Sequence, residues 1–189
     1  YDKFNGAVHV MVRPESEFKT FSLAMDEGYT NPAVILLIGE DGDGRLHIFK
    51  EFYKTGVLQA DVVEKARDWW IDHNCTQCAV DASAAGLIAD LRHAGVKANP
   101  YKGRVLDGIT AVQALLKVAG DKRPRLTVDP SCINLINEFE SYIWKPTKDE
   151  PVKENDHALD ALRYYVVSQD PGATWEDVKE LGTVENYKS

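Results

Sequence analysis

The sequence predicts an α/β fold in which one mixed β-sheet is covered by helices on its faces. Two observations carry this prediction. Near the N-terminus, three apolar segments separated by short turns follow one another, which is typical of an antiparallel meander. Further along, short buried-strand patterns alternate with segments of helical spacing, which is typical of parallel strands joined by helices. With 189 residues the chain is long enough for one domain with a sizeable core.

The meander is expected to contain strands at residues 21–26, 33–39 and 45–53. The middle segment is a run of β-branched and aliphatic residues, which indicates a strand that is buried on both faces. The Asp-Gly-Asp-Gly sequence at 41–44 is typical of a turn between strands. It lacks the downstream ligands and the closing Glu of an EF-hand, so we do not expect a calcium loop there.

Helical spacing over residues 58–74 places apolar side chains on one broad face. Trp69 and Trp70 belong to this face, and we expect them to anchor the core; a platform on which bases stack is the alternative. A short buried strand follows at 77–81. Ser83 is then expected to cap the next helix, because a Ser hydroxyl can accept hydrogen bonds from the free N–H groups of the first turn.

The rest of the chain continues the alternation of strands and helices. We expect short strands at 96–100 and 125–128, and helices at 83–93, at 108–118, from 131 onward and at 155–167. Residues 1–20 are weakly patterned, and the pattern lapses again over 169–189. We interpret these ends as a linker-like segment and a tail, on either side of one domain at 21–168.

The charge distribution bears on the kind of partner. The formal net charge is −8, which argues against strong binding of nucleic-acid phosphates. Residues 97–125 nevertheless hold seven basic and two acidic residues, so this segment is locally basic. Lys102 and Arg104 in this segment, and Lys153 further on, are candidates for phosphate contacts. The longest apolar run, at 33–39, is too short to span a membrane, so no membrane partner is expected.

Three cysteines provide no disulfide framework, and no secretory leader opens the chain, which together favour a reducing compartment. Cys75 and Cys78 have CxxC spacing, but no second pair of zinc ligands follows them. A thioredoxin-type site would place such a pair at the start of a helix, whereas Cys78 enters a predicted strand. We therefore expect these cysteines to be structural.

Three aspartates are candidates for a metal site. Asp26 and Asp81 each end an apolar run that is typical of a buried strand, and Asp160 lies on the last predicted helix. Carboxylate oxygens from separate elements form the kind of pocket that Mg²⁺ or Mn²⁺ requires. Two such ions, about 3.5–4 Å apart, activate a water molecule and stabilise charge on a scissile phosphate. The three acids together therefore point to metal-dependent cleavage of a phosphodiester.

His157 precedes Asp160 by three residues, so the two side chains lie on the same face of the helix. This histidine can ligate a metal, orient a water molecule or protonate the leaving group; a simple hydrogen-bonded histidine is the alternative. Asp156 is expected to cap the N-terminus of the same helix. Asn31 either adds a neutral oxygen ligand or only shapes the turn before Pro32.

Four segments of the chain, in their order and spacing, resemble the C-terminal nuclease domain of the large terminase subunit of tailed bacteriophages. They are residues 25–32, 80–88, 129–132 and 154–164, and the resemblance extends over roughly 1–168. It implies a ribonuclease H-like fold, akin to that of Holliday-junction resolvases. It also implies that the metal-binding acids are Asp26, Asp81 and Asp160, with His157 in an additional position that some members use. Asn31 stands where many relatives have an acid.

The resemblance further implies an endonuclease that cuts concatemeric viral double-stranded DNA, with little sequence preference, during genome packaging in the cytoplasm of the infected bacterial host. The expected cofactors are Mg²⁺ or Mn²⁺, as two ions. The expected partners are DNA, the ATPase domain of the same full-length protein, the portal and the small terminase subunit. No Gly-x-x-x-x-Gly-Lys-Ser/Thr motif occurs in this chain. The alternatives are a non-cleaving module that docks the packaging motor or grips DNA, and a resolvase or transposase of the same fold.

Overall fold

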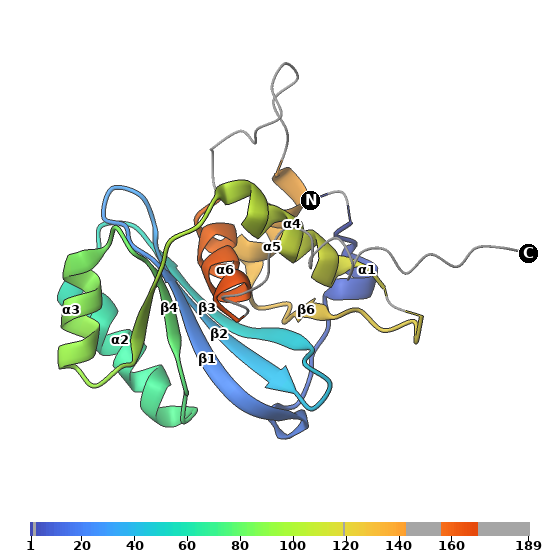
Figure 1. Ribbon diagram of the computed structural model, residues 1–189, viewed down its shortest axis with the longest axis horizontal. Coiled ribbons are helices and arrows are strands. Elements are labelled where there is room, and N and C mark those ends of the chain that lie inside the picture. The colour runs from blue at the N-terminus through green and yellow to red at the C-terminus, as the bar shows by residue number, and fades with distance from the viewer. Residues whose placement is uncertain (2, 119, 143–155, 170–189) are drawn as a thin grey trace, which may run out of the picture.

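The computed structural model describes residues 1, 3–118, 120–142 and 156–169, and six strands form one mixed sheet in this part of the chain (Figure 1). The strands are β1 (Phe18–Asp26), β2 (Ala33–Asp41), β3 (Leu46–Lys54), β4 (Cys78–Asp81), β5 (Ala98–Tyr101) and β6 (Leu126–Val128). They lie side by side in the order β5-β4-β1-β2-β3-β6. β2 runs antiparallel to both of its neighbours, and the other neighbouring pairs are parallel. The predicted α/β class, an antiparallel meander extended by parallel strands, is confirmed.

Helices cover both faces of this sheet. They are α1 (Gly6–His9), α2 (Gln59–Asp72), α3 (Ala85–His93), α4 (Val105–Leu116), α5 (Ile133–Ser141) and α6 (His157–Ser168). α2 and α3 lie on one face, and α4, α5 and α6 lie on the other (Figure 1). No helix within the described ranges combines the length and the apolar character that a membrane crossing needs.

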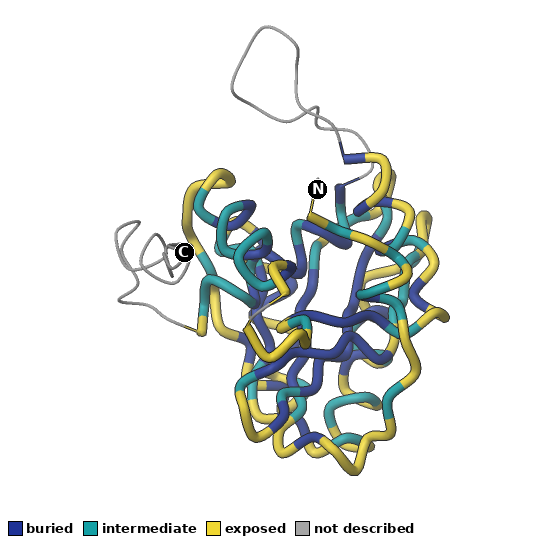
Figure 2. The backbone as a smooth tube through the Cα atoms, turned by 90° about the vertical axis from the view of Figure 1, so that its right-hand side faces the viewer, coloured by how far each residue is buried: buried dark blue, intermediate teal, exposed yellow. Residues whose placement is uncertain are grey.

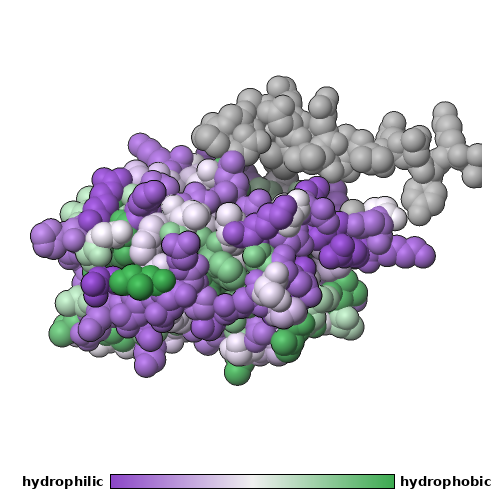
Figure 3. All heavy atoms as spheres, turned by 90° about the horizontal axis from the view of Figure 1, so that it is seen from below, coloured by the Kyte–Doolittle hydropathy of each residue, from purple (hydrophilic) through white to green (hydrophobic). Residues whose placement is uncertain are grey.

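The core is double because the central strands are buried on both faces. Along β2, Val34 and Leu36 pack with α4, α5 and α6, while Ile35 and Leu37 pack with α2 and α3. This division follows from the alternation of side chains across a strand. Figure 2 shows the buried backbone concentrated in the middle of the fold, and the face in Figure 3 is mostly hydrophilic where the chain is described. The prediction for β2 is therefore confirmed.

Two local predictions about α2 and α3 need adjustment. Trp69 and Trp70 do pack against the core between these helices and the sheet, but both are only partly buried. Ser83 does not cap α3, which begins at Ala85 without a side-chain cap. Instead the carboxylate of Asp81 accepts a hydrogen bond from the Ser83 N–H at 2.7 Å. The prediction of a serine cap was wrong because the acid two residues earlier forms the turn itself.

The N-terminal residues, predicted as linker-like, pack against the buried side chains of α5 and Tyr142. Tyr1 is 7% exposed, and its ring stacks on that of Tyr142 with centroids 5.0 Å apart. Phe4 stacks on Phe139 of α5 at 4.5 Å. α1 follows, capped by the side chain of Asn5. The domain limits at 21 and 168 stay a prediction, and of the predicted tail only residue 169 lies within the described residues.

All three cysteines are buried as free thiols. Burial raises the pKa of the Cys75 thiol to about 12 and that of the Cys78 thiol further, with a smaller contribution from Cys75. A raised pKa disfavours the thiolate, which is the form that attacks disulfides and binds metals. These observations support a structural role for the CxxC pair.

His47 of β3 is a fully buried histidine in an aromatic environment. Its Nδ1 lies 2.8 Å from the hydroxyl oxygen of Thr127, and its ring packs against Phe18 and Phe49. Burial, together with the positive charge of Arg13, lowers the pKa of His47 from 6.5 to about 4. The folded protein therefore keeps this ring neutral under conditions where an unfolded chain protonates it.

We predict that His47 contributes a loss of unfolding free energy as the pH is lowered from 6.5 towards 4, because the unfolded state then binds a proton that folded His47 does not. Glu138 of α5, whose pKa burial raises to about 7, contributes in the opposite sense, so the His47 contribution is the difference between the parent and His47→Gln. At about 1.4 kcal/mol per pKa unit, the loss approaches roughly 3 kcal/mol. Urea unfolding at a series of pH values measures it. His47→Gln should remove this contribution, whereas His93→Gln on the exposed end of α3 should leave the pH dependence of the parent unchanged. An unchanged pH dependence in His47→Gln would contradict the assignment.

The surroundings of two helical glycines predict opposite effects of a Gly→Ala substitution on the free energy of unfolding. A Cβ at Gly108 of α4 would lie 2.9 Å from the side chain of Arg163 of α6, whereas a Cβ at Gly86 of α3 would meet only the end of Gln59 at 3.8 Å. Gly108→Ala should lower the free energy of unfolding by about 1–3 kcal/mol through overpacking. Gly86→Ala should raise it by up to about 1 kcal/mol through helix propensity. Thermal unfolding of both variants tests the pair, and equal shifts of the same sign would contradict the described α4–α6 contact.

Candidate active site

Two of the predicted acids end neighbouring parallel strands. Met25 of β1 pairs with Val80 of β4, so the next residues, Asp26 and Asp81, lie at the same edge of the sheet. The sequence predicted that both acids end strands, and the parallel pairing of these strands brings the two ends to one edge. The Asp26 side chain is only 13% exposed, and Asp81 is held by the hydrogen bond from the Ser83 N–H.

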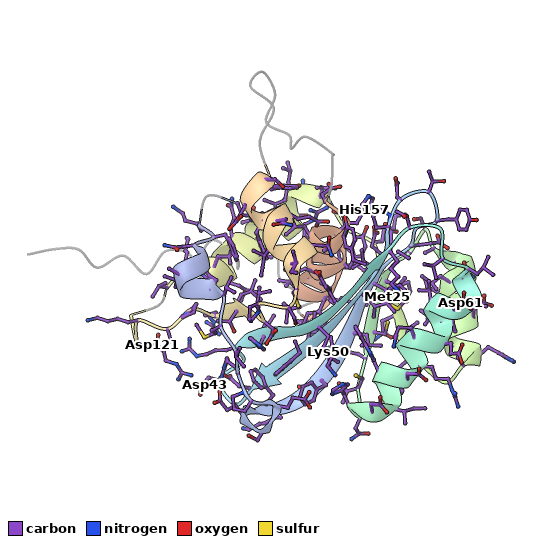
Figure 4. The ribbon with its side chains drawn as sticks, turned by 180° about the vertical axis from the view of Figure 1, so that it is seen from behind. Met25, Asp43, Lys50, Asp61, Asp121 and His157 are labelled. Carbon is purple, nitrogen blue, oxygen red and sulfur yellow. The ribbon has the colours of Figure 1, made fainter. Side chains whose placement is uncertain are left out.

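α6 brings His157 to this edge. Its Nδ1 lies 3.0 Å from Oδ2 of Asp26, across 131 residues of sequence. Figure 4 shows His157 at the end of the sheet opposite to Asp43, which lies in the turn between β2 and β3. The hydrogen bond to Asp26 raises the pKa of His157, although partial burial opposes it. A charged imidazolium against a carboxylate is therefore favoured at this contact.

Tyr164 is a site residue that the sequence analysis missed. Its hydroxyl donates a hydrogen bond to Oδ1 of Asp26 at 3.3 Å, and it also interacts with the Asp81 carboxylate. Tyr164 follows His157 by seven residues, or two helical turns, so the helical period places both on one face. That spacing was the available signal. Tyr164 and His157 together occupy both oxygens of Asp26.

Asp160 has a different environment. It forms an ion pair with Arg163, one turn further along α6, whose buried guanidinium also donates to the Tyr142 hydroxyl at 3.4 Å. Over the part of the chain that the structure describes, no group of three or more His, Cys, Asp or Glu side chains is arranged to hold a metal ion. The structure thus joins Asp26, His157 and Asp81, and it leaves Asp160 paired with Arg163.

Asp156 takes the N-cap position of α6, as predicted, but its side chain makes no capping hydrogen bond. Its backbone oxygen accepts the Asp160 N–H at 2.7 Å. The cap comes instead from Glu138 of α5, whose Oε2 accepts the Leu159 N–H at 2.9 Å. Burial raises the pKa of Glu138 to about 7. Sequence spacing contains no signal for this contact, because it joins two helices.

Asn31 is exposed in the loop between β1 and β2.

The candidate phosphate-binding residues Lys102 and Arg104 follow β5, close to the same edge. Tyr101, the last residue of β5, pairs with Asp81. Arg104 forms two hydrogen bonds with Asp107, at 2.9 and 3.0 Å, so part of its charge is compensated locally. Lys102 is exposed. Lys153 lies outside the described residues.

Comparisons with known proteins identify relatives of this fold. The family described as "Terminase RNAseH like domain" matches residues 41–168. The large terminase of a thermophilic bacteriophage is 30% identical, with a TM-score of 0.76 over 89% of this chain and 44% of that one. This chain therefore spans less than half of that thermophilic-phage protein, which has also been solved with ATP-γ-S. No curated protein matches.

Two solved domains share the fold at lower identity. The nuclease domain of the P22 large terminase has a TM-score of 0.70 at 17% identity, over 93% of this chain and 95% of that one. The nuclease domain of the large terminase of bacteriophage SPP1, solved with bound Mn, has a TM-score of 0.64 at 17% identity, over 86% and 97%. The resemblance noted in the sequence and the ribonuclease H-like fold are confirmed. On the family match, this chain belongs to the terminase RNase H-like domains.

Proposed function

We propose that this chain is a divalent-metal-dependent endonuclease that cleaves concatemeric viral double-stranded DNA, with low sequence specificity, during genome packaging. The observation that carries the proposal is the meeting of Asp26, Asp81 and His157 at one edge of the sheet. Family membership supports a nuclease role connected with packaging. The contact to His157 gives this edge an acid and a proton donor side by side.

The donor atoms at this edge suit a hard divalent cation, because they are carboxylate oxygens. We propose Mg²⁺ or Mn²⁺, as two ions held by Asp26, Asp81 and Asp160; the SPP1 domain, solved with Mn, supports this class of metal. To join the other two acids, Asp160 must give up its ion pair with Arg163. When bound, the metal would lower the pKa of an attacking water and stabilise charge on the phosphate.

His157 has two tasks in this proposal. Its contact with Asp26 orients the imidazole and favours its protonated form. A protonated ring can donate from Nε2 to the oxygen that leaves when the phosphodiester is cut. Lys102 and Arg104, next to the same edge, would contact DNA phosphates and position the backbone without reading its sequence. Lys153 is proposed for the same task.

The proposed setting is the packaging motor. The large terminase of the thermophilic bacteriophage is more than twice as long as this chain's matched part and has been solved with ATP-γ-S, which supports an ATPase domain in the same full-length protein. The portal and the small terminase subunit are proposed as further partners, and the cytoplasm of the infected bacterial host as the location. The nuclease domain is proposed to comprise residues 21–168, with 1–20 joining it to the preceding domain and 169–189 as a tail.

A second function has two observations in its favour. The net charge of −8 and the ion pair of Asp160 with Arg163 both fit a module that docks the motor and does not cut DNA by itself. A protein that binds procapsids and leaves plasmid intact with Mn²⁺ or Mg²⁺ would support this alternative. Preferential cutting of four-way junctions over linear duplex would instead indicate a resolvase-like nuclease.

We predict that Asp26→Asn, Asp81→Asn and Asp160→Asn each slow plasmid cleavage by more than about 100-fold. The reason is that even partners of metal ligands contribute about 10–100-fold to affinity or activity, and a ligand contributes more. Conversion of supercoiled plasmid to nicked and linear forms with Mn²⁺ or Mg²⁺ measures the rate, and EDTA should abolish it. Asp68→Asn, on the exposed face of α2, is the matched control. Parental rates in Asp26→Asn and Asp81→Asn would exclude the proposal.

We predict that Lys102→Ala weakens binding to DNA of any sequence and leaves kcat unchanged, since a phosphate contact positions the duplex but does not take part in the chemistry. The slope of log affinity against log salt should decrease by about one unit. Lys19→Ala, at the start of β1 and thus at the other end of the sheet, should leave both quantities unchanged. A lower kcat with unaltered affinity would show that Lys102 acts otherwise.

A further inference from the structure

The helix that carries His157 and Asp160 begins without a cap of its own. The first turn of an α-helix leaves N–H groups without partners inside the helix. At the start of α6, Asp156 contributes only its backbone oxygen, because its side chain makes no capping hydrogen bond. The position of His157, the first residue of α6, therefore depends on what else satisfies this turn.

Glu138 satisfies it from the neighbouring helix. Its Oε2 accepts the Leu159 N–H at 2.9 Å. Glu138 is 3% exposed, so water does not replace this acceptor easily. Tyr53 of β3 lies near the same carboxyl, and burial together with the charge of that carboxyl raises the pKa of Tyr53. Glu138 thus joins α5 to the first turn of α6.

The same arrangement recurs one helix earlier. α5 also lacks a side-chain cap of its own. Glu51 of β3 accepts the N–H groups of Asn134 and Leu135 at 2.8 and 2.9 Å, and the Asn134 side-chain amide at 2.7 Å. α5, which presents Glu138, is therefore itself fixed to the sheet at its first turn. Two glutamates in succession connect β3 to α5 and α5 to α6.

We propose that Glu138 is a positioning residue for the active site: by capping α6 from α5, it fixes the place from which His157 reaches Asp26. The first turn of α6 lies between two anchors. Glu138 binds the backbone N–H of Leu159, and Asp26 binds the side chain of His157, two residues earlier. Asp160 is the next residue after Leu159, so it lies in the same turn. Loss of the cap loosens this turn and moves both side chains relative to the sheet edge.

The proposal rests on the proposed nuclease function only for its effect on cleavage; the cap itself is testable in the metal-free chain. In the parent protein, the Leu159 amide should exchange with solvent as slowly as amides inside α6, such as that of Leu162, because it is hydrogen-bonded. An uncapped first turn would exchange freely. A rapidly exchanging Leu159 amide would overturn the proposal without any variant.

Two substitutions of Glu138 separate its role as a hydrogen-bond acceptor from its negative charge. Glu138→Gln keeps an oxygen that can accept the Leu159 N–H, whereas Glu138→Ala removes it. Glu138→Ala should speed exchange of the Leu159 amide by about 5–30-fold, which corresponds to the usual contribution of a helix cap. It should also shift the NMR signals of the His157 ring and lower kcat by about tenfold at unchanged KM for DNA. Glu138→Gln should restore all of these to within about threefold, and Glu140→Ala, on the exposed side of α5, should resemble the parent.

The outcomes are distinguishable. Parental Leu159 exchange and parental His157 signals in Glu138→Ala overturn the positioning role, and so does a Glu138→Gln protein that is as impaired as Glu138→Ala. If Glu138→Ala does not fold, the parent exchange pattern and Glu138→Gln still decide. If the parent does not cut DNA, the proposed function fails, while exchange at Leu159 and the His157 signals continue to test the cap.

Discussion

The hydrogen bond between His157 and Asp26 connects the last described helix to the central strand, and the arrangement of the site depends on it. Asp26 has a fixed place because it ends a strand that is paired on both sides. Buried side chains such as Leu159 and Leu162 pack α6 against the sheet, the Glu138 cap holds its first turn, and the His157 contact joins that turn to Asp26. Bonds to charged groups contribute about 1.5–3 kcal/mol. Once the turn is fixed, the helical period places Tyr164 at the other oxygen of Asp26.

The electrostatics of this edge follow from its two carboxylates. Asp26 and Asp81 end adjacent parallel strands, so two negative charges lie next to each other at the sheet edge. A charged His157 compensates the charge of Asp26, and the Tyr164 hydroxyl donates a hydrogen bond to the same carboxylate. A cation binding here would compete with these groups for the same oxygens, and with Arg163 for Asp160. Metal affinity is therefore a balance between the cation and this internal network.

Much of the fold was predictable from sequence because local patterns determine it. The aliphatic run of β2 and the apolar runs before Asp26 and Asp81 gave the central strands, and parallel pairing then placed both acids at one edge. Contacts between distant elements were not predictable in this way. The cap by Glu138 and the packing of Tyr1 on α5 depend on how helices dock. The pair of Asp160 with Arg163 differs, because it lies within α6 at a spacing of three residues that the sequence did contain. Residue spacing within one element does not encode that docking.

The nuclease proposal requires divalent cations to bind at the edge where Asp26 and Asp81 meet. A crystal structure of this protein grown with Mn²⁺, with the anomalous signal of manganese located, tests it most directly. We expect peaks within coordination distance of both carboxylates, with Asp160 turned away from Arg163 to become a ligand. Crystals that contain Mn²⁺ elsewhere, but none at this edge, with Asp26 still bonded to His157 and Tyr164, would contradict the account.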